Sequence, residues 1–158
     1  MASGLSRGAY SGRETKLYYN SGTHAVPAWT EIPRGKNIQV NDGPALSEIE
    51  FHGASSTGNI PGYDKFSGSY EYVRKRGTDA VYAALKSARR NKNIVVLRHL
   101  NQDISVSGAD GWDAPVLLGE SASTANGGEG VMETFPFGKA DAFDSNGDSV
   151  EVEDVVIA

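Results

Sequence analysis

The side chains that most often carry catalysis or hold metals are few and scattered in this chain of 158 residues. The chain has no cysteine, which excludes a thiolate nucleophile, a disulfide and a cysteine metal site. The three histidines, His24, His52 and His99, lie far apart, and no pair has the spacing that places two imidazoles on one helix face. These observations predict a protein that is not an enzyme.

One short segment, DSNGD at residues 144–148, has the alternating oxygen side chains that calcium loops use. An EF-hand loop starting at Asp144 would need glycine and glutamate where the chain has Ser149 and Val155. A tight hairpin turn explains the same residues. No glycine pattern between a strand and a helix offers a phosphate cradle. We therefore expect no metal and no other cofactor.

Two basic runs, RKRG at residues 74–77 and ARRNK at residues 88–92, are compatible with nucleic-acid binding. However, the chain as a whole has a formal net charge of −5, and no base-stacking motif accompanies either run. A solvated helix end is the simpler interpretation of these residues. We therefore expect no specific binding of DNA.

Charge is divided unevenly along the chain. Residues 1–100 contain 14 Lys and Arg against 8 Asp and Glu, whereas residues 101–158 contain 1 against 12. Either the two halves neutralise each other within one domain, or the front of one copy docks on the back of the next. The second interpretation predicts a head-to-tail homo-oligomer.

Composition favours a single β-rich domain. A chain of this length can bury a real core, and its 19 glycines suit strands that are joined by many turns. Residues 1–14 are rich in Ser and Gly without periodicity, which predicts a flexible N-terminal arm before one domain at residues 15–158. No apolar run is long enough to insert into a membrane, and no signal-peptide core is present. We therefore expect synthesis in a cytoplasm.

The expected elements form a mostly β (α+β) fold of sandwich or barrel type with one flanking helix. That helix is expected within residues 77–92, with Thr78 as its N-cap and Asp79 in its first turn. Its inward face is expected to consist of Val81, Ala84, Leu85 and Ala88, with Arg89 and Arg90 facing outward or toward a neighbour. Strands are expected at residues 16–19, 29–32, 36–41, 46–51, 66–74, 93–100, 116–122, 131–137 and 149–157.

Two connections are expected between the strands in the first half of the chain. NDGP at residues 41–44 predicts a turn, and the small residues 52–65 predict a long loop. The strands on either side of that loop could form one hairpin. Alternation places Phe66, Tyr70 and Tyr72 inward in one of them. In the other strand it places Ile49 and Phe51 toward the core, with Ser47, Glu48 and Glu50 as the polar face.

This order of elements resembles that of the tail tube (major tail) proteins of long-tailed bacteriophages and related phage-like particles. The likeness rests on LYYNSGTHAVPAWTEI and KNIQV near the start, on IEFHG and FSGSYEYV around the small-residue loop, and on DAVYAALKSAR as the helix. It continues in NIVVLRHL, VLLGES and VMETFPFGKA. It covers about residues 16–140 and says little about the acidic C-terminal segment.

The resemblance implies a structural virion protein whose subunits form hexameric rings, stacked head to tail into a tail tube. Strands from each subunit would complete a ring-shaped β-barrel around the lumen. The implied partners are other copies of the chain, the tape-measure protein, and the tail terminator and tip proteins. DNA would pass through the lumen without specific binding. Assembly would take place in the cytoplasm of the bacterial host.

Two sets of residues are candidates for the contacts that such a tube requires. A lumen that lets DNA slide needs polar residues with few cations, and the outward positions that fit are Glu48, Glu50, Ser67, Ser69 and Glu71. The long loop is the candidate for reaching the adjacent ring. Its central residues are Ser55, Ser56, Thr57, Gly58 and Asn59.

Two other functions remain open at this point. A capsid decoration protein or another structural protein of the virion would share the β-rich, cysteine-free composition. A small carbohydrate-binding β-sandwich would use Trp29, Trp112 and the tyrosines as a sugar platform. The alternation around Tyr70 and Tyr72 favours core packing for those two tyrosines instead.

Overall fold

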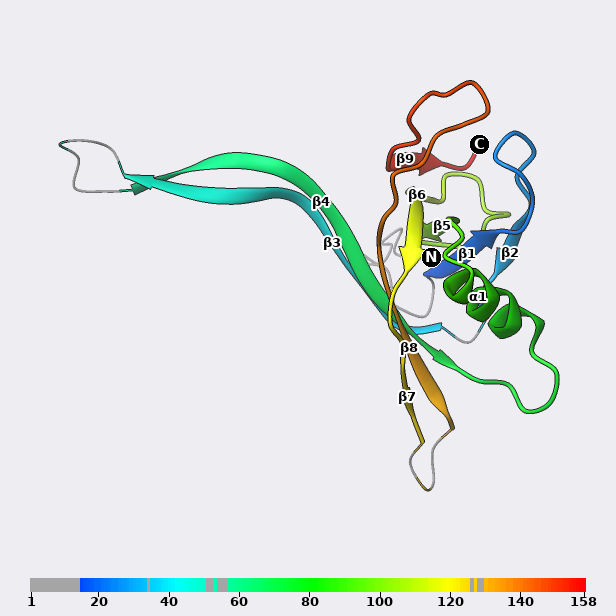
Figure 1. The fold of residues 1–158 in the computed structure, drawn as a ribbon. Coiled ribbons are helices and arrows are strands. Elements are labelled where there is room, and N and C mark those ends of the chain that lie inside the picture. Colours follow the sequence, from blue (N-terminus) through cyan, green and yellow to red (C-terminus); the bar gives the residue numbers. More distant parts are fainter. Residues whose placement is uncertain (1–14, 34, 51–52, 54–56, 126, 128–129) are drawn as a thin grey trace, which may run out of the picture.

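The computed structural model describes residues 15–33, 35–50, 53, 57–125, 127 and 130–158 (Figure 1). The predicted N-terminal arm lies outside these residues, and its flexibility stays a prediction. The described elements, in chain order, are β1 (Lys16–Asn20), β2 (Trp29–Glu31), β3 (Gly35–Glu50), β4 (Thr57–Val73), α1 (Ala80–Arg90), β5 (Val95–Leu100), β6 (Asp110–Leu118), β7 (Ala122–Thr124), β8 (Met132–Lys139) and β9 (Glu153–Val156).

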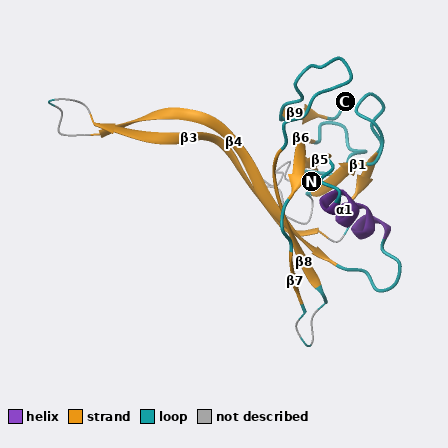
Figure 2. Cartoon of the chain, viewed as in Figure 1, coloured by secondary structure: helices purple, strands orange, loops and turns teal. Residues whose placement is uncertain are grey.

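All nine described strands belong to one antiparallel sheet with the order β2-β1-β5-β6-β8-β4-β3, in which β7 is added to β8 and β9 to β6. One helix packs on this sheet (Figure 2). The core lies where the β1–β5–β6 part of the sheet, the β4–β8 part and α1 meet. The predicted mostly β fold with one helix is therefore confirmed.

The predicted alternation in β4 is confirmed by burial. Phe66, Tyr70 and Tyr72 are buried, whereas Ser67, Ser69 and Glu71 point to the opposite face. Gly68 lies on the core face of β4 at a position with no room for a side chain. A Cβ at this position would lie 2.7 Å from the Phe137 ring and 2.2 Å from the carbonyl oxygen of Gln39. The glycine therefore lets the Phe137 ring pack directly against the β4 backbone.

The turn that was predicted at residues 41–44 is wrong, because β3 is one continuous strand. Its backbone pairs with β4 from Gly35, opposite Tyr72, to Glu50, opposite Thr57. Gly43 has φ +139, and the register shifts between Pro44 and Leu46. The glycine and proline therefore mark an irregularity in a paired strand, and the chain does not reverse there.

The predicted long loop is also wrong over residues 57–65, which form the first part of β4. Thr57, Gly58 and Asn59 pair with Glu50, Ile49 and Glu48 of β3. Ser55 and Ser56 lie outside the described residues. Figure 1 shows that β3 and β4 leave the body together and project from it as a long two-stranded hairpin.

Helix α1 begins after Asp79, which is the N-cap in place of the predicted Thr78. The Asp79 carboxylate accepts hydrogen bonds from the backbone N–H groups of Lys75 (3.0 Å) and Tyr82 (3.1 Å) and from the Tyr72 hydroxyl (2.8 Å). Burial alone would raise the pKa of Asp79, but these hydrogen bonds lower it below its usual value. This carboxylate ties the start of the helix to β4.

The inward face of α1 is rotated relative to the prediction. Tyr82 and Leu85 are buried, and Val81 and Ala88 are partly buried against the core, whereas Ala84 is exposed. Tyr82 was not among the residues predicted to face inward. Its ring stacks on that of Tyr72, with 6.2 Å between the ring centroids.

We predict that Leu85→Asp lowers the free energy of unfolding by about 4 kcal/mol or more, because it buries an unpaired carboxylate. Leu85 is 1% exposed. The matched variant Ala84→Asp places the same charge at the preceding, exposed position and should destabilise by about 1 kcal/mol or less, mainly through the lower helix propensity of Asp. Urea unfolding followed by circular dichroism measures both values. Equal small losses in the two variants would remove α1 from the core.

Candidate assembly surfaces

The outer half of the β3–β4 hairpin exposes large apolar side chains. Leu46, Ile60 and Tyr63 are 67%, 47% and 92% exposed, respectively. A two-stranded hairpin without a core is marginally stable in water, and apolar groups that remain exposed on it are typical of a contact surface. Sequence reasoning missed these three residues because they lie among small polar residues. Tyr63 was the available signal of a contact surface, because it is an aromatic residue in a polar segment with no predicted core partner.

The predicted lumen residues Glu48 and Glu50 lie on this outer half of the hairpin, and both are exposed. Glu48 accepts a hydrogen bond from the Thr57 hydroxyl at 2.6 Å. Ile49 is half-buried and lies outside the core cluster, contrary to the prediction, because the hairpin has left the body at this point. Ser47 lies on the same face as Ile49 and opposite to the glutamates, since successive residues of a strand point to opposite faces. The predicted polar row therefore consists of the two glutamates alone.

The other predicted lumen residues lie on the body, on the sheet face opposite the core. Cross-strand pairing places Asn41 beside Ser67, Gln39 beside Ser69 and Thr134 beside Glu71. We call these six residues the polar strip. Glu71 accepts a hydrogen bond from the Asn37 side chain at 2.8 Å. Lys65 continues the same face where the hairpin leaves the body. Within one subunit, the strip is separate from Glu48 and Glu50.

A basic surface runs along α1 and the two connections that flank it. Residues 74–92 contain seven Lys and Arg against one Asp. We define the basic surface as Lys75, Arg76, Lys86, Arg90 and Lys92; Lys86 is half-buried and the other four are exposed. None of these five forms an ion pair with a carboxylate in the described part of the chain. Figure 1 shows α1 on the side of the body away from the hairpin.

Arg89 was predicted to face outward or toward a neighbour, and this is wrong. Its guanidinium lies 3.2 Å from the carboxylate of Glu133, whose side chain is only 5% exposed. The Ser121 hydroxyl donates to the same carboxylate oxygen at 2.8 Å. Burial and the nearby Glu133 carboxylate raise the pKa of Tyr82. Arg89 therefore neutralises the buried Glu133 carboxylate, whereas the cations around Arg89 are exposed.

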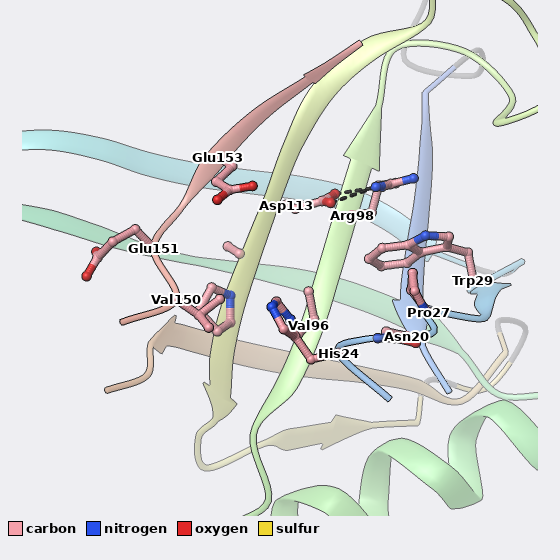
Figure 3. A pocket seen from close by; sticks show the side chains of 12 residues that line it. Asn20, His24, Pro27, Trp29, Val96, Arg98, Asp113, Val150, Glu151 and Glu153 are labelled. Carbon is pink, nitrogen blue, oxygen red and sulfur yellow. Dashed lines mark hydrogen bonds and ion pairs between the residues drawn. The ribbon is translucent and has the colours of Figure 1, made fainter. Parts of the chain in front are cut away.

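A pocket of about 130 Å³ lies between the β1–β2 connection and the C-terminal segment (Figure 3). Arg98 crosses it and donates two hydrogen bonds to Asp113, at 2.6 and 2.7 Å. The guanidinium also covers the Trp29 ring, 4.0 Å from its centroid. Trp112 packs edge-on against Phe66 at 5.0 Å. The two tryptophans therefore do not form the open platform that the carbohydrate-binding alternative requires.

Two of the three histidines and the acidic turn lie within the described residues. His24 lines the pocket, and His99 packs beside Trp112, where burial lowers its pKa. His52 lies outside the described residues. The Asp144 carboxylate accepts hydrogen bonds from the backbone N–H groups of Asn146 and Asp148, as in the predicted tight turn. Among the described residues, no three His, Asp or Glu side chains gather as a metal site, and no helix could span a membrane.

Comparison with known proteins identifies the fold. No family model and no curated protein sequence matches the chain. Among solved structures, the chain is similar to a chain of the SPP1 tail tube, with a TM-score of 0.70 and 14% sequence identity. The match covers 94% of this chain and 80% of that chain. The chain has the tail tube fold.

Two further structures show how widely the tail tube fold is shared. A chain of the tail of an empty gene transfer agent particle, refined with C6 symmetry, matches with a TM-score of 0.65 at 11% identity and covers 85% of this chain and 96% of that chain. A chain of the anti-feeding prophage tube-terminating cap matches with a TM-score of 0.62 at 10% identity over 99% of both chains. The predicted resemblance to tail tube proteins is therefore confirmed at the level of the fold.

We predict that Arg89→Met destabilises the subunit by about 3–5 kcal/mol, because the Glu133 carboxylate then stays buried without its cation. Arg90→Met, one residue along the same helix, removes an exposed cation and should cost less than about 0.5 kcal/mol. Replacing both Arg89 and Glu133 with Met should recover much of the loss. Denaturant unfolding compares the three variants. An equal, small effect of Arg89→Met and Arg90→Met would contradict the inward placement of Arg89.

Proposed function

We propose that the chain is a structural virion protein, the subunit of stacked hexameric rings that form a phage tail tube and conduct DNA. The observation that carries this proposal is the likeness to the SPP1 tail tube over 94% of the chain. The exposed hairpin supports it, because apolar residues so far from the core need a partner. The subunit has no catalytic role in this proposal; its function lies in its surfaces.

Ring closure would pair the backbone groups that are free at the edges of the sheet. In the described chain, β2 and β3 end the strand order, and each has one neighbouring strand. An exposed edge presents unpaired backbone groups, and closure of strands from several copies into a barrel removes such edges. We propose that the sheets of six subunits join in this way around the lumen.

We propose that the polar strip lines this lumen. Its central residues, Ser67 and Ser69, are uncharged, and its one carboxylate, Glu71, repels phosphate. DNA that meets few cations gains few phosphate contacts and moves freely. Since Glu48 and Glu50 lie on the projecting hairpin, we now assign them to a contact between subunits.

The hairpin is proposed to reach the adjacent ring, so that rings stack head to tail. Other partners would be the tape-measure protein inside the tube and the terminator and tip proteins at its ends. A likeness to the tube-terminating cap of the anti-feeding prophage is compatible with a tube that ends in chains of similar fold. Assembly is proposed to occur in the cytoplasm of the bacterial host, and the product is the tail of the virion.

The proposal is tested by assembly of the purified full chain. We expect wild-type protein to form rings or tubes on concentration, visible by negative-stain microscopy and as large species in sedimentation velocity. A variant with Leu46, Ile60 and Tyr63 changed to Ser should remain folded, because these side chains are at least 47% exposed, but should not form tubes.

A matched variant controls for loss of exposed apolar surface elsewhere. Val26→Ser and Val156→Ser remove side chains that are 73% and 70% exposed on the body, and tubes should still form. A wild-type chain that stays monomeric at every concentration would contradict the proposed function. Tubes formed equally well by the hairpin variant would contradict the role of the hairpin.

The lumen assignment predicts a gain of DNA binding. Ser67→Lys with Ser69→Lys should leave tubes intact but make them retain duplex DNA. The log–log salt dependence of that binding should steepen by about 0.9 for each phosphate contacted. Ala25→Lys with Ser107→Lys adds the same charge to exposed loop positions of the body. Co-sedimentation of tubes with DNA compares the two, and equal retention by both variants would remove the strip from the lumen.

A further inference from the structure

The hairpin and the basic surface carry opposite charge. Residues 42–65, which include the outer half of the hairpin, contain four Asp and Glu against one Lys. The basic surface has five cations that form no ion pair within the described part of the subunit. Two unneutralised surfaces of opposite sign on one chain are complementary when one copy meets another.

The two surfaces also lie on different sides of the molecule. Figure 1 shows the hairpin leaving the body on the side away from α1 and from the connection that precedes it. A surface that meets a different surface on an identical copy makes a heterologous contact, which repeats in one direction. Such a contact suits head-to-tail stacking and cannot form within one subunit.

The charged groups match in spacing. Glu48 and Glu50 are alternate residues of β3, so their side chains share a face and lie about 7 Å apart along the strand. Lys86 and Arg90 are four residues apart on α1, so they are neighbours on the helix surface at about 6 Å. Each pair is therefore able to meet the other in register.

Lys86 is also held in place by a contact within the helix. The ammonium of Lys86 lies 5.7 Å from the centroid of the Tyr82 ring, which is itself 8% exposed. The neighbouring Arg89 is committed to Glu133 and is not available to a partner. The exposed charge of the helix end therefore comes from Lys86, Arg90 and Lys92.

From these observations we infer that the acidic end of the β3–β4 hairpin docks on the basic surface of a second copy, with Glu48 and Glu50 meeting Lys86 and Arg90. This inference rests on the proposed tube function and names the surface that receives the hairpin. It also assigns a role to the basic runs that does not involve nucleic acid.

Charge reversal tests the inference with the full chain. Glu48→Lys/Glu50→Lys and, separately, Lys86→Glu/Arg90→Glu should each raise the protein concentration needed for tube formation by at least about tenfold, because like charges then meet at the contact. Glu120→Lys/Asp141→Lys alters two exposed carboxylates on the body and should leave that concentration unchanged. Thermal melts of the dilute subunits confirm that each variant is folded.

Restoration of tube formation by combining the two charge reversals is the decisive part of the test. The chain that combines both reversals should form tubes again. An equimolar mixture of the two reversed variants should also co-assemble, because each hairpin then finds a surface of opposite charge on the other variant. Negative-stain microscopy and sedimentation report both results. Restoration in either sample supports the proposed pairing.

Three results would overturn the inference. Tubes formed normally by either reversed variant would show that the pairs do not meet. Two blocked variants that neither the mixture nor the combined chain restores would show that they act at separate contacts. A Lys86→Glu/Arg90→Glu variant that forms tubes but loses DNA binding would assign the basic surface to nucleic acid. If wild-type protein itself forms no tubes, the proposed function fails and this contact falls with it.

Discussion

A two-stranded β-ribbon has only its own cross-strand contacts to stabilise it in water, and β3 and β4 leave the core as such a ribbon. The inner half of each strand lies in the sheet, where Phe66, Tyr70 and Tyr72 are buried. The outer half exposes Leu46, Ile60 and Tyr63. The subunit therefore consists of a packed core and an extension whose apolar side chains are exposed, and we propose that another copy covers them. The chain that carries this hairpin has the fold of the SPP1 tail tube chain.

Polar contacts tie the base of the hairpin to the rest of the subunit. Asp79 links the start of α1 to β4 through the Tyr72 hydroxyl, and Arg89 links the end of the helix to Glu133 of β8. Because β8 pairs with β4, both polar links hold the helix on β4, one strand of the hairpin, and on the strand beside it. A rigid base presents the hairpin in one direction, which reduces the entropy lost on docking. The same links turn the remaining cations of the helix outward.

Much of this fold could be predicted from sequence because the core imposes a period. Alternation identified the buried face of β4, and helical spacing located α1 to within a few residues. The hairpin could not be predicted in the same way, because strands that pack on no core lack the alternation of apolar and polar residues that a buried face imposes. Gly43 and Pro44 therefore suggested a turn where the strand continues. Pairing between Arg89 and Glu133 joins residues 44 positions apart, and such a contact leaves no local signal.

The proposed functional surfaces could also be predicted where their residues alternate with core residues, and could not be predicted on the hairpin. Ser67 and Ser69 were identified because they alternate with core residues, and the structure places them on the face opposite the core. Glu48 and Glu50 were grouped with them by sequence pattern, but pairing carries these two residues out along the hairpin. The partner of an exposed surface lies on another copy of the chain, so neither a sequence pattern nor the packing of one subunit identifies it. The opposite charges of the hairpin and of the basic surface are the reason for proposing that the two surfaces meet.

The most direct test of the account is a cryo-EM reconstruction of the assembly formed by the purified wild-type chain. The account predicts a hollow tube of stacked rings in which residues 42–50 and 57–65 of each copy lie against a neighbouring copy. Tyr63, which is 92% exposed in the isolated subunit, should be buried there. A tube in which the hairpins project freely into solvent would contradict the account.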